Sequence, residues 1–287
     1  MQSWDDTEVA RRWLTLCPHR KTPDGKPLPP SEPELNSIRR CPVRLAEIRG
    51  RLSNISWWMR LLCQRVAQRA NREDEQTGRF FQDRYRAVRL IDEESLLACA
   101  AYVDLNPIRA AMAQTLESSD HTSVQRRIEA MAAQPTAGGV ARPTPESTDC
   151  PDSPASSHTD RPADAFLSPL TINEAADPIG PCPSVTAERC SDKGFLSLPL
   201  VEYLELLDWT ARQVVPGKRG STAASVPWVL RRLGLEPSSW CELVSDFGKL
   251  FSTVAGHPRR VDAARSHRTH RRFHLTRRVR ELMTPSD

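Results

Sequence analysis

The sequence has no apolar run long enough to span a lipid bilayer, since a spanning helix needs about 20 predominantly apolar residues. It also lacks the pattern of a secretory signal peptide, because Met1 to Glu8 are mostly polar and acidic. No internal repeat is found. We therefore expect a cytoplasmic protein without membrane contact.

Closely spaced metal ligands are absent as well. Eight cysteines occur, but none forms a CxxC pair and none stands at zinc-ligand spacing from a histidine. Cys63 and Cys99 fall inside apolar helical patterns, where cysteine acts as a small hydrophobic residue. This distribution favours reduced thiols in a cytoplasm over a disulfide framework.

Glycine is sparse at 12 residues, whereas proline is abundant at 24 in a chain of 287. Ten of the prolines lie between Gln134 and Ser191, a stretch with many Ser and Thr and a single aromatic residue, Phe166. Such a segment cannot bury a core. We expect four regions: a folded domain over 1–133, a disordered linker over 134–192, a small helical domain over 193–256 and a basic tail over 257–287.

Charge is distributed in blocks. Arg39 to Arg72 holds nine Arg and one acid, His257 to Arg280 again holds nine Arg and one acid, and Gln134 to Ser191 holds three Arg and eight acids. Basic blocks of this kind bind nucleic acid through phosphate contacts. The alternatives are a solvated helix face for the first block and a disordered basic end for the second.

The first basic block contains the longest predicted helix. A helix over about 43–52 precedes it, and Asn54 is a good N-cap for it. Its apolar stripe is predicted to face a core, while Arg60, Arg65 and Arg69 lie on the other faces, where they would contact a phosphate backbone. The predicted stripe consists of Ile55, Trp58, Met59, Leu62 and Val66.

A strand and a buried helix are predicted next. Residues from Tyr85 to Ile91 alternate and are rich in β-branched and aromatic types, which favours a strand. Asp92 can cap a mostly apolar helix that Asn106 and Pro107 end or kink.

Tyr102 and Asn106 are four residues apart on that helix, so one face would carry both side chains. An Asn oxygen is a fair ligand for Mg²⁺, and such a cation could polarise a phosphate that a phenol attacks. The alternative is that Tyr102 is a packed core residue.

Two runs carry a family resemblance: Gly78 to Tyr85 (GRFFQDRY) and Tyr102 to Ala110 (YVDLNPIRA). In this order and spacing they resemble the C-terminal half of single-tyrosine, His-hydrophobic-His DNA transposases, like those associated with repetitive extragenic palindromes. The resemblance implies a ferredoxin-like α+β domain, binding of hairpin or single-stranded DNA, a phosphotyrosine intermediate and a divalent metal, Mg²⁺ or Mn²⁺. It implies that Tyr102 is the nucleophile and that Asn106 stands beside the metal.

The same resemblance suggests phosphate contacts for Arg84, Arg86, Arg89 and Arg109. However, the two histidines of the family's metal motif have no counterpart upstream, where His19 stands alone, and the family's first strands are also missing. We therefore expect an α+β protein with an incomplete ferredoxin-like N-terminal region, a long disordered linker and a small all-α C-terminal region.

The expected function is that of an N-terminally truncated, transposase-related DNA-binding protein. By the resemblance, the complete form would cleave and join single-stranded DNA, whereas the chain as written is expected to be inactive. Loss of two metal ligands should abolish tight metal binding. The alternatives are a nucleic-acid-binding or regulatory helical module in which Tyr102 only packs, and a helical interaction protein. A homodimer is a further expectation.

Overall fold

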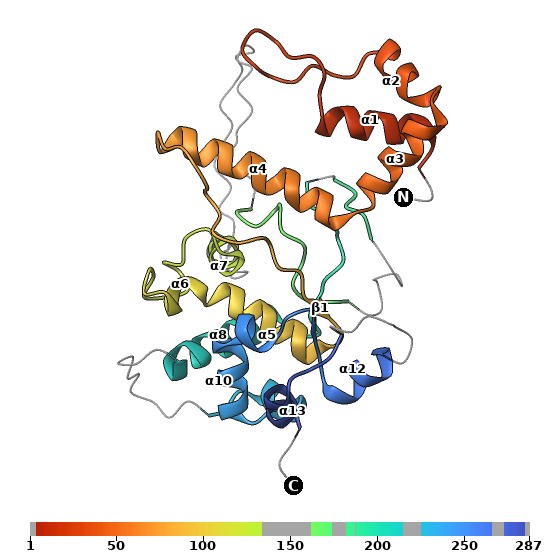
Figure 1. The fold of residues 1–287 in the computed structure, drawn as a ribbon. Coiled ribbons are helices and arrows are strands. Elements are labelled where there is room, and N and C mark those ends of the chain that lie inside the picture. Colours follow the sequence, from red (N-terminus) through yellow and green to blue (C-terminus); the bar gives the residue numbers. More distant parts are fainter. Residues whose placement is uncertain are drawn as a thin grey trace, which may run out of the picture. The chain divides into compact units, whose positions relative to one another are not determined.

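The computed structural model describes residues 4–133, 162–173, 182–186, 188–214, 225–265 and 273–284. It comprises two compact units, Met1–Tyr85 (unit 1) and Arg86–Asp287 (unit 2) (Figure 1). Over the described ranges the chain forms thirteen helices and two short strands. The residues of the predicted domain 1–133 are thus distributed over both units.

The predicted ferredoxin-like α+β fold is wrong. The described strands are β1 (Arg89–Leu90) and β2 (Val254–Ala255), which pair in parallel over two residues each. A strand needs a neighbouring strand for its backbone hydrogen bonds. Only two residues of the strand predicted over 85–91 find such a neighbour, so a sheet does not form there.

Unit 1 begins with three helices, α1 (Asp6–Leu16), α2 (Glu32–Arg39) and α3 (Pro42–Leu52). They contact one another around a small core. A capping box between Ser31 and Glu34 starts α2, a signal that lies at the end of a proline-rich loop in the sequence. The core is formed by Val9, Ala10, Trp13, Leu14, Leu35, Ile38, Leu45, Ile48 and Leu52.

The fourth helix of unit 1, α4 (Ile55–Glu73), is capped as predicted by the Asn54 side chain, which accepts hydrogen bonds from the backbone N–H groups of Ser56 and Trp57. Its predicted core face is wrong, because Leu62 is 55% exposed and α4 has no buried residue. Instead Trp57, which lies off that stripe, packs against the core of unit 1.

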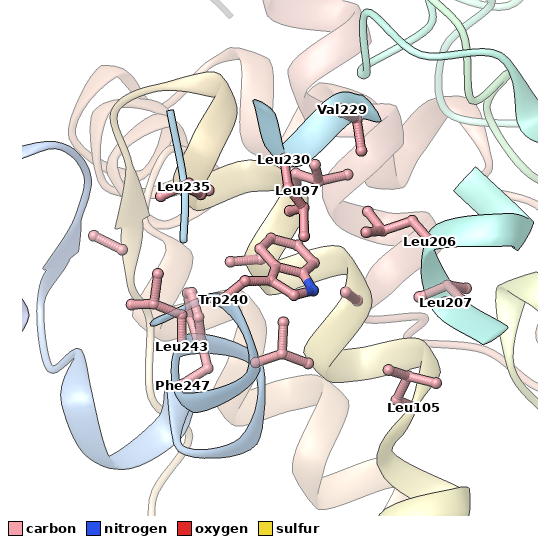
Figure 2. Packing of buried hydrophobic residues seen from close by; sticks show 14 of the residues in the cluster. Leu97, Leu105, Leu206, Leu207, Val229, Leu230, Leu235, Trp240, Leu243 and Phe247 are labelled. Atoms are coloured by element: carbon pink, nitrogen blue, oxygen red, sulfur yellow. The ribbon is translucent and has the colours of Figure 1, made fainter. Parts of the chain in front are cut away.

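Unit 2 is built around one apolar core (Figure 2). Trp240 is fully buried at its centre, and its indole N–H donates a 2.8 Å hydrogen bond to the Thr210 hydroxyl. Leu97, from before the proline-rich segment, and Leu206, from after it, both belong to this core. The helices are α5 (Glu93–Asp104), α6 (Asn106–Arg109), α7 (Ser123–Ala133), α8 (Leu200–Val214), α9 (Trp228–Arg232), α10 (Pro237–Ser245), α11 (Phe247–Leu250), α12 (Pro258–Arg265) and α13 (Arg277–Met283).

A separate all-α C-terminal region is therefore also incorrect as a description of the fold, because residues from both sides of the linker share this core. The linker itself contributes to it. Leu170 is buried, Thr171 forms a backbone bridge with Leu196, and Arg127 donates a 2.7 Å hydrogen bond to the Ser168 carbonyl. Disorder is thus the wrong expectation for 162–173, while 134–161 lies outside the described residues.

Candidate nucleic-acid interface

The residue expected to be the nucleophile, Tyr102, lies half-buried on α5 in unit 2. Its ring packs 5.7 Å from that of Phe247, and the Arg109 guanidinium lies 5.0 Å from the ring centroid. At Gly248 an added Cβ would stand 3.0 Å from the Tyr102 hydroxyl oxygen. Tyr102 is therefore packed closely against the first residues of α11.

Two of the expected phosphate-binding arginines bind the end of α10 and the adjoining helix α11. Arg109 donates to the Ser245 carbonyl, and Arg86 donates a 2.8 Å hydrogen bond to the Gly248 carbonyl. A second Arg109 nitrogen, Nη1, is buried and has no hydrogen-bond partner in the part of the chain that the structure describes. The structure thus gathers Tyr102, Arg86 and Arg109, but the guanidinium groups bind backbone carbonyls of unit 2.

The expected metal site does not assemble. Asn106 is exposed at the first residue of α6. The nearest carboxylate in sequence, Asp104, is buried and accepts hydrogen bonds from Ser123 and Tyr203. In the ranges that the structure describes, no three His, Cys, Asp or Glu side chains are grouped so that they could hold a metal ion. Asn106 by itself offers one neutral side-chain oxygen, whereas Mg²⁺ is usually held in proteins by one or two carboxylates.

The remaining expected DNA contacts are divided between the two units. Arg89 is exposed on β1 of unit 2, and Arg84 is exposed in unit 1. Arg69 pairs with Glu73 at 2.7 Å on an exposed part of α4. Arg65 donates to the Leu16 carbonyl at the end of α1. Sequence reasoning therefore selected residues that belong to two different units.

Unit 1 contains a basic groove along one side of α4. Two hollows, of about 860 and 550 Å³, share Cys17 and are lined by successive turns of α4. From Trp57 to Arg72, α4 rises about 23 Å at 1.5 Å per residue. We call this pair of hollows the α4 groove. Its charged lining residues are Lys21, Arg51, Arg60, Arg65 and Arg72, and no Asp or Glu of the described ranges lines either hollow.

The charged side chains that line the α4 groove among the described residues are all positive. Among the described residues, Lys21 and Arg60 make no ion pair, whereas Arg51 pairs with Glu47 outside the groove lining. Burial raises the pKa of the Cys17 thiol, against the opposing charges of Arg65 and Arg51. The thiol is therefore neutral near pH 7 and does not reduce the positive charge.

Polar amides complete the groove. Gln64 lines the smaller hollow, and Gln68 and Asn71 line the larger one.

Sequence reasoning identified Arg60 and Arg65 but missed Lys21, Arg51 and Arg72 as parts of one site. For Arg51 and Arg72 the available signal was the acid-poor block over 39–72, whereas Lys21 lies outside that block. None of the described helices combines the length and apolar character that crossing a bilayer requires. No family model, curated protein or solved structure matches the chain.

Proposed function

We propose that this chain is a DNA-binding protein related to the single-tyrosine transposases, and that it binds DNA through the α4 groove without cleaving it. The relationship rests on the two sequence runs at 78–85 and 102–110. Binding rests on one observation: a groove of about 23 Å with five cationic side chains and no carboxylate in its lining.

Phosphate recognition needs cations that are free to move to the ligand. Lys21 and Arg60 have no ion-pair partner among the described residues, and Arg72 is bonded only to the Gln68 carbonyl on its own helix. Backbone phosphates spaced about 3.4 Å apart along one strand would place roughly seven charges along the groove. The amide side chains supply further donors to phosphate or sugar oxygens.

The surroundings of Tyr102 support the proposed absence of cleavage. A phenol attacks phosphate poorly unless a cation and the phosphate are held beside it. Here Arg86 and Arg109 are bound to carbonyls, and the described residues contain no group of three His, Cys, Asp or Glu side chains that could hold a metal ion. Tyr102 thus serves as a packing residue of unit 2. A single-stranded or hairpin target and a homodimeric state stay predictions.

Salt dependence tests the binding proposal. Counterion release makes log K fall with log salt by about 0.7 per phosphate contact on a single strand. The full chain with a 12-nucleotide oligothymidylate should show a slope of about −2 to −3.5, for three to five contacts. A slope near zero, or the absence of binding at low salt, would overturn the proposal.

A further inference from the structure

The smaller hollow of the α4 groove differs from the larger one because two indole rings line it. Trp13 and Trp57 stack with centroids 5.1 Å apart and an angle of 26° between their planes. We infer that this hollow is a stacking site for an unpaired nucleobase. The inference rests on the proposed function, because it assumes that the groove binds nucleic acid.

The two rings are held in place before any ligand arrives. The Arg51 guanidinium lies 5.5 Å from the Trp13 ring centroid. The Trp57 ring meets that of Trp58 edge-on at 6.1 Å, and the Trp58 indole N–H donates a 2.8 Å hydrogen bond to the Leu52 carbonyl. Preorganised aromatic rings lose little entropy when a planar ligand binds. Base stacking on such rings tolerates any sequence, because every base has a π-face.

The rest of the lining suits the other parts of a nucleotide. Gln64 lies two helical turns beyond Trp57, and its amide offers both a donor and an acceptor for a base edge. Arg60 lines the same hollow and makes no ion pair among the described residues, so it can contact the phosphate. A base inside a duplex is stacked and paired, so only an unpaired base can present its face and edge to this hollow.

Packing alone would also bring Trp57 against Trp13, since Trp57 contacts the core of unit 1. The two explanations differ in one respect. A packing role affects the folding of unit 1 and leaves recognition of bases unchanged. A stacking role makes affinity depend on whether the ligand carries bases.

The test compares two probes with the same phosphates: a 12-nucleotide oligothymidylate and an abasic oligonucleotide of equal length. Wild type should bind oligothymidylate more tightly, by about 5- to 150-fold if one base stacks. Trp57→Leu, which keeps apolar bulk without the ring, should remove that preference, so that the variant binds the two probes with equal affinity. Trp57→Phe should retain most of the preference.

A second readout uses the wild-type chain, so it does not depend on the folding of a variant. An oligothymidylate carrying 5-iodouracil should photocrosslink to the peptide that contains Trp57. Equal affinity for both probes, or crosslinks confined to other peptides, would overturn the stacking site while the salt-dependent binding persists. Loss of salt-dependent binding for both probes would instead overturn the proposed function.

Discussion

Tyr203 donates a 2.8 Å hydrogen bond to Asp104, a residue 99 positions earlier in the chain, and both side chains are buried. The other carboxylate oxygen of Asp104 accepts a 2.8 Å hydrogen bond from the Ser123 hydroxyl. Asp104 therefore joins α5, α7 and α8 through one carboxylate. It belongs to the run at 102–110 that resembles a catalytic motif, yet its role here is structural.

Replacing Tyr203 by Phe should destabilise unit 2 by about 1–3 kcal/mol, because a buried carboxylate oxygen loses its donor. Urea unfolding followed by circular dichroism measures this change. The control is Tyr85→Phe in unit 1, which removes a hydroxyl bonded to Ser56 in an exposed position and should cost less. Equal effects of the two variants would mean that the buried bond contributes no more than the exposed one.

Alkaline pH should destabilise unit 2 through the same tyrosine. Burial, and then the neighbouring Asp104 carboxylate, raises the pKa of Tyr203 well above its ordinary value. The folded chain therefore holds this proton more tightly than the unfolded chain. The resulting stabilisation is constant below about pH 10. Above that pH, stability should fall by up to about 1.4 kcal/mol per pH unit.

Tyr203→Phe isolates this contribution. Buried thiols such as Cys99, whose pKa burial also raises, titrate in both proteins and cancel in the comparison. The two unfolding free energies should converge as pH rises above 10. A constant difference between pH 8 and 11 would contradict the assignment.

Leu170 tests whether the segment 162–173 belongs to the core of unit 2. Leu170→Ala should destabilise unit 2 by about 2–5 kcal/mol, the usual cost of a cavity at a buried leucine. Phe166, in the same segment, is 57% exposed, so Phe166→Ala should change stability by less than about 0.5 kcal/mol. If both variants change the free energy of unfolding by similarly small amounts, the segment 162–173 is part of a disordered linker, as its composition predicts.

Tyr102→Phe should leave both folding and DNA binding unchanged. Its ring contacts with Phe247 and Arg109 survive the loss of the hydroxyl, so stability should stay within about 0.5 kcal/mol. Incubation with labelled hairpin or single-stranded DNA and Mg²⁺ or Mn²⁺ should yield no nick with either protein. A covalent protein–DNA adduct formed by wild type and abolished in Tyr102→Phe would show that the account of Tyr102 is wrong.

Local signals were readable from the sequence. The Asn54 and Asp92 side chains cap α4 and α5 as predicted. Which face of α4 packs against a core could not be predicted from the sequence, because that helix carries apolar residues on two sides. The spacing of apolar residues predicted that the face of Leu62 would be buried. In the structure it is the face of Trp57 that packs, because Trp57 stacks on Trp13.

The α4 groove could not be predicted for a related reason. Lys21 and Arg72 line the same hollow although 51 positions separate them. Charge counting finds a basic block, but it does not show that the end of α1 and the following loop lie beside α4. The fold class failed because two short motifs were extended to a whole sheet, whereas β1 pairs with β2 over only two residues.

The most direct test of the central claim compares two charge-matched double variants. Arg60→Gln with Arg72→Gln removes two cations from the α4 groove, whereas Arg40→Gln with Arg44→Gln removes two exposed cations that do not line it. Binding of oligothymidylate should lose about 1 to 2 units of salt slope in the first variant and little in the second. Equal losses in both would mean that the chain binds DNA through diffuse charge and that the α4 groove is not its binding site.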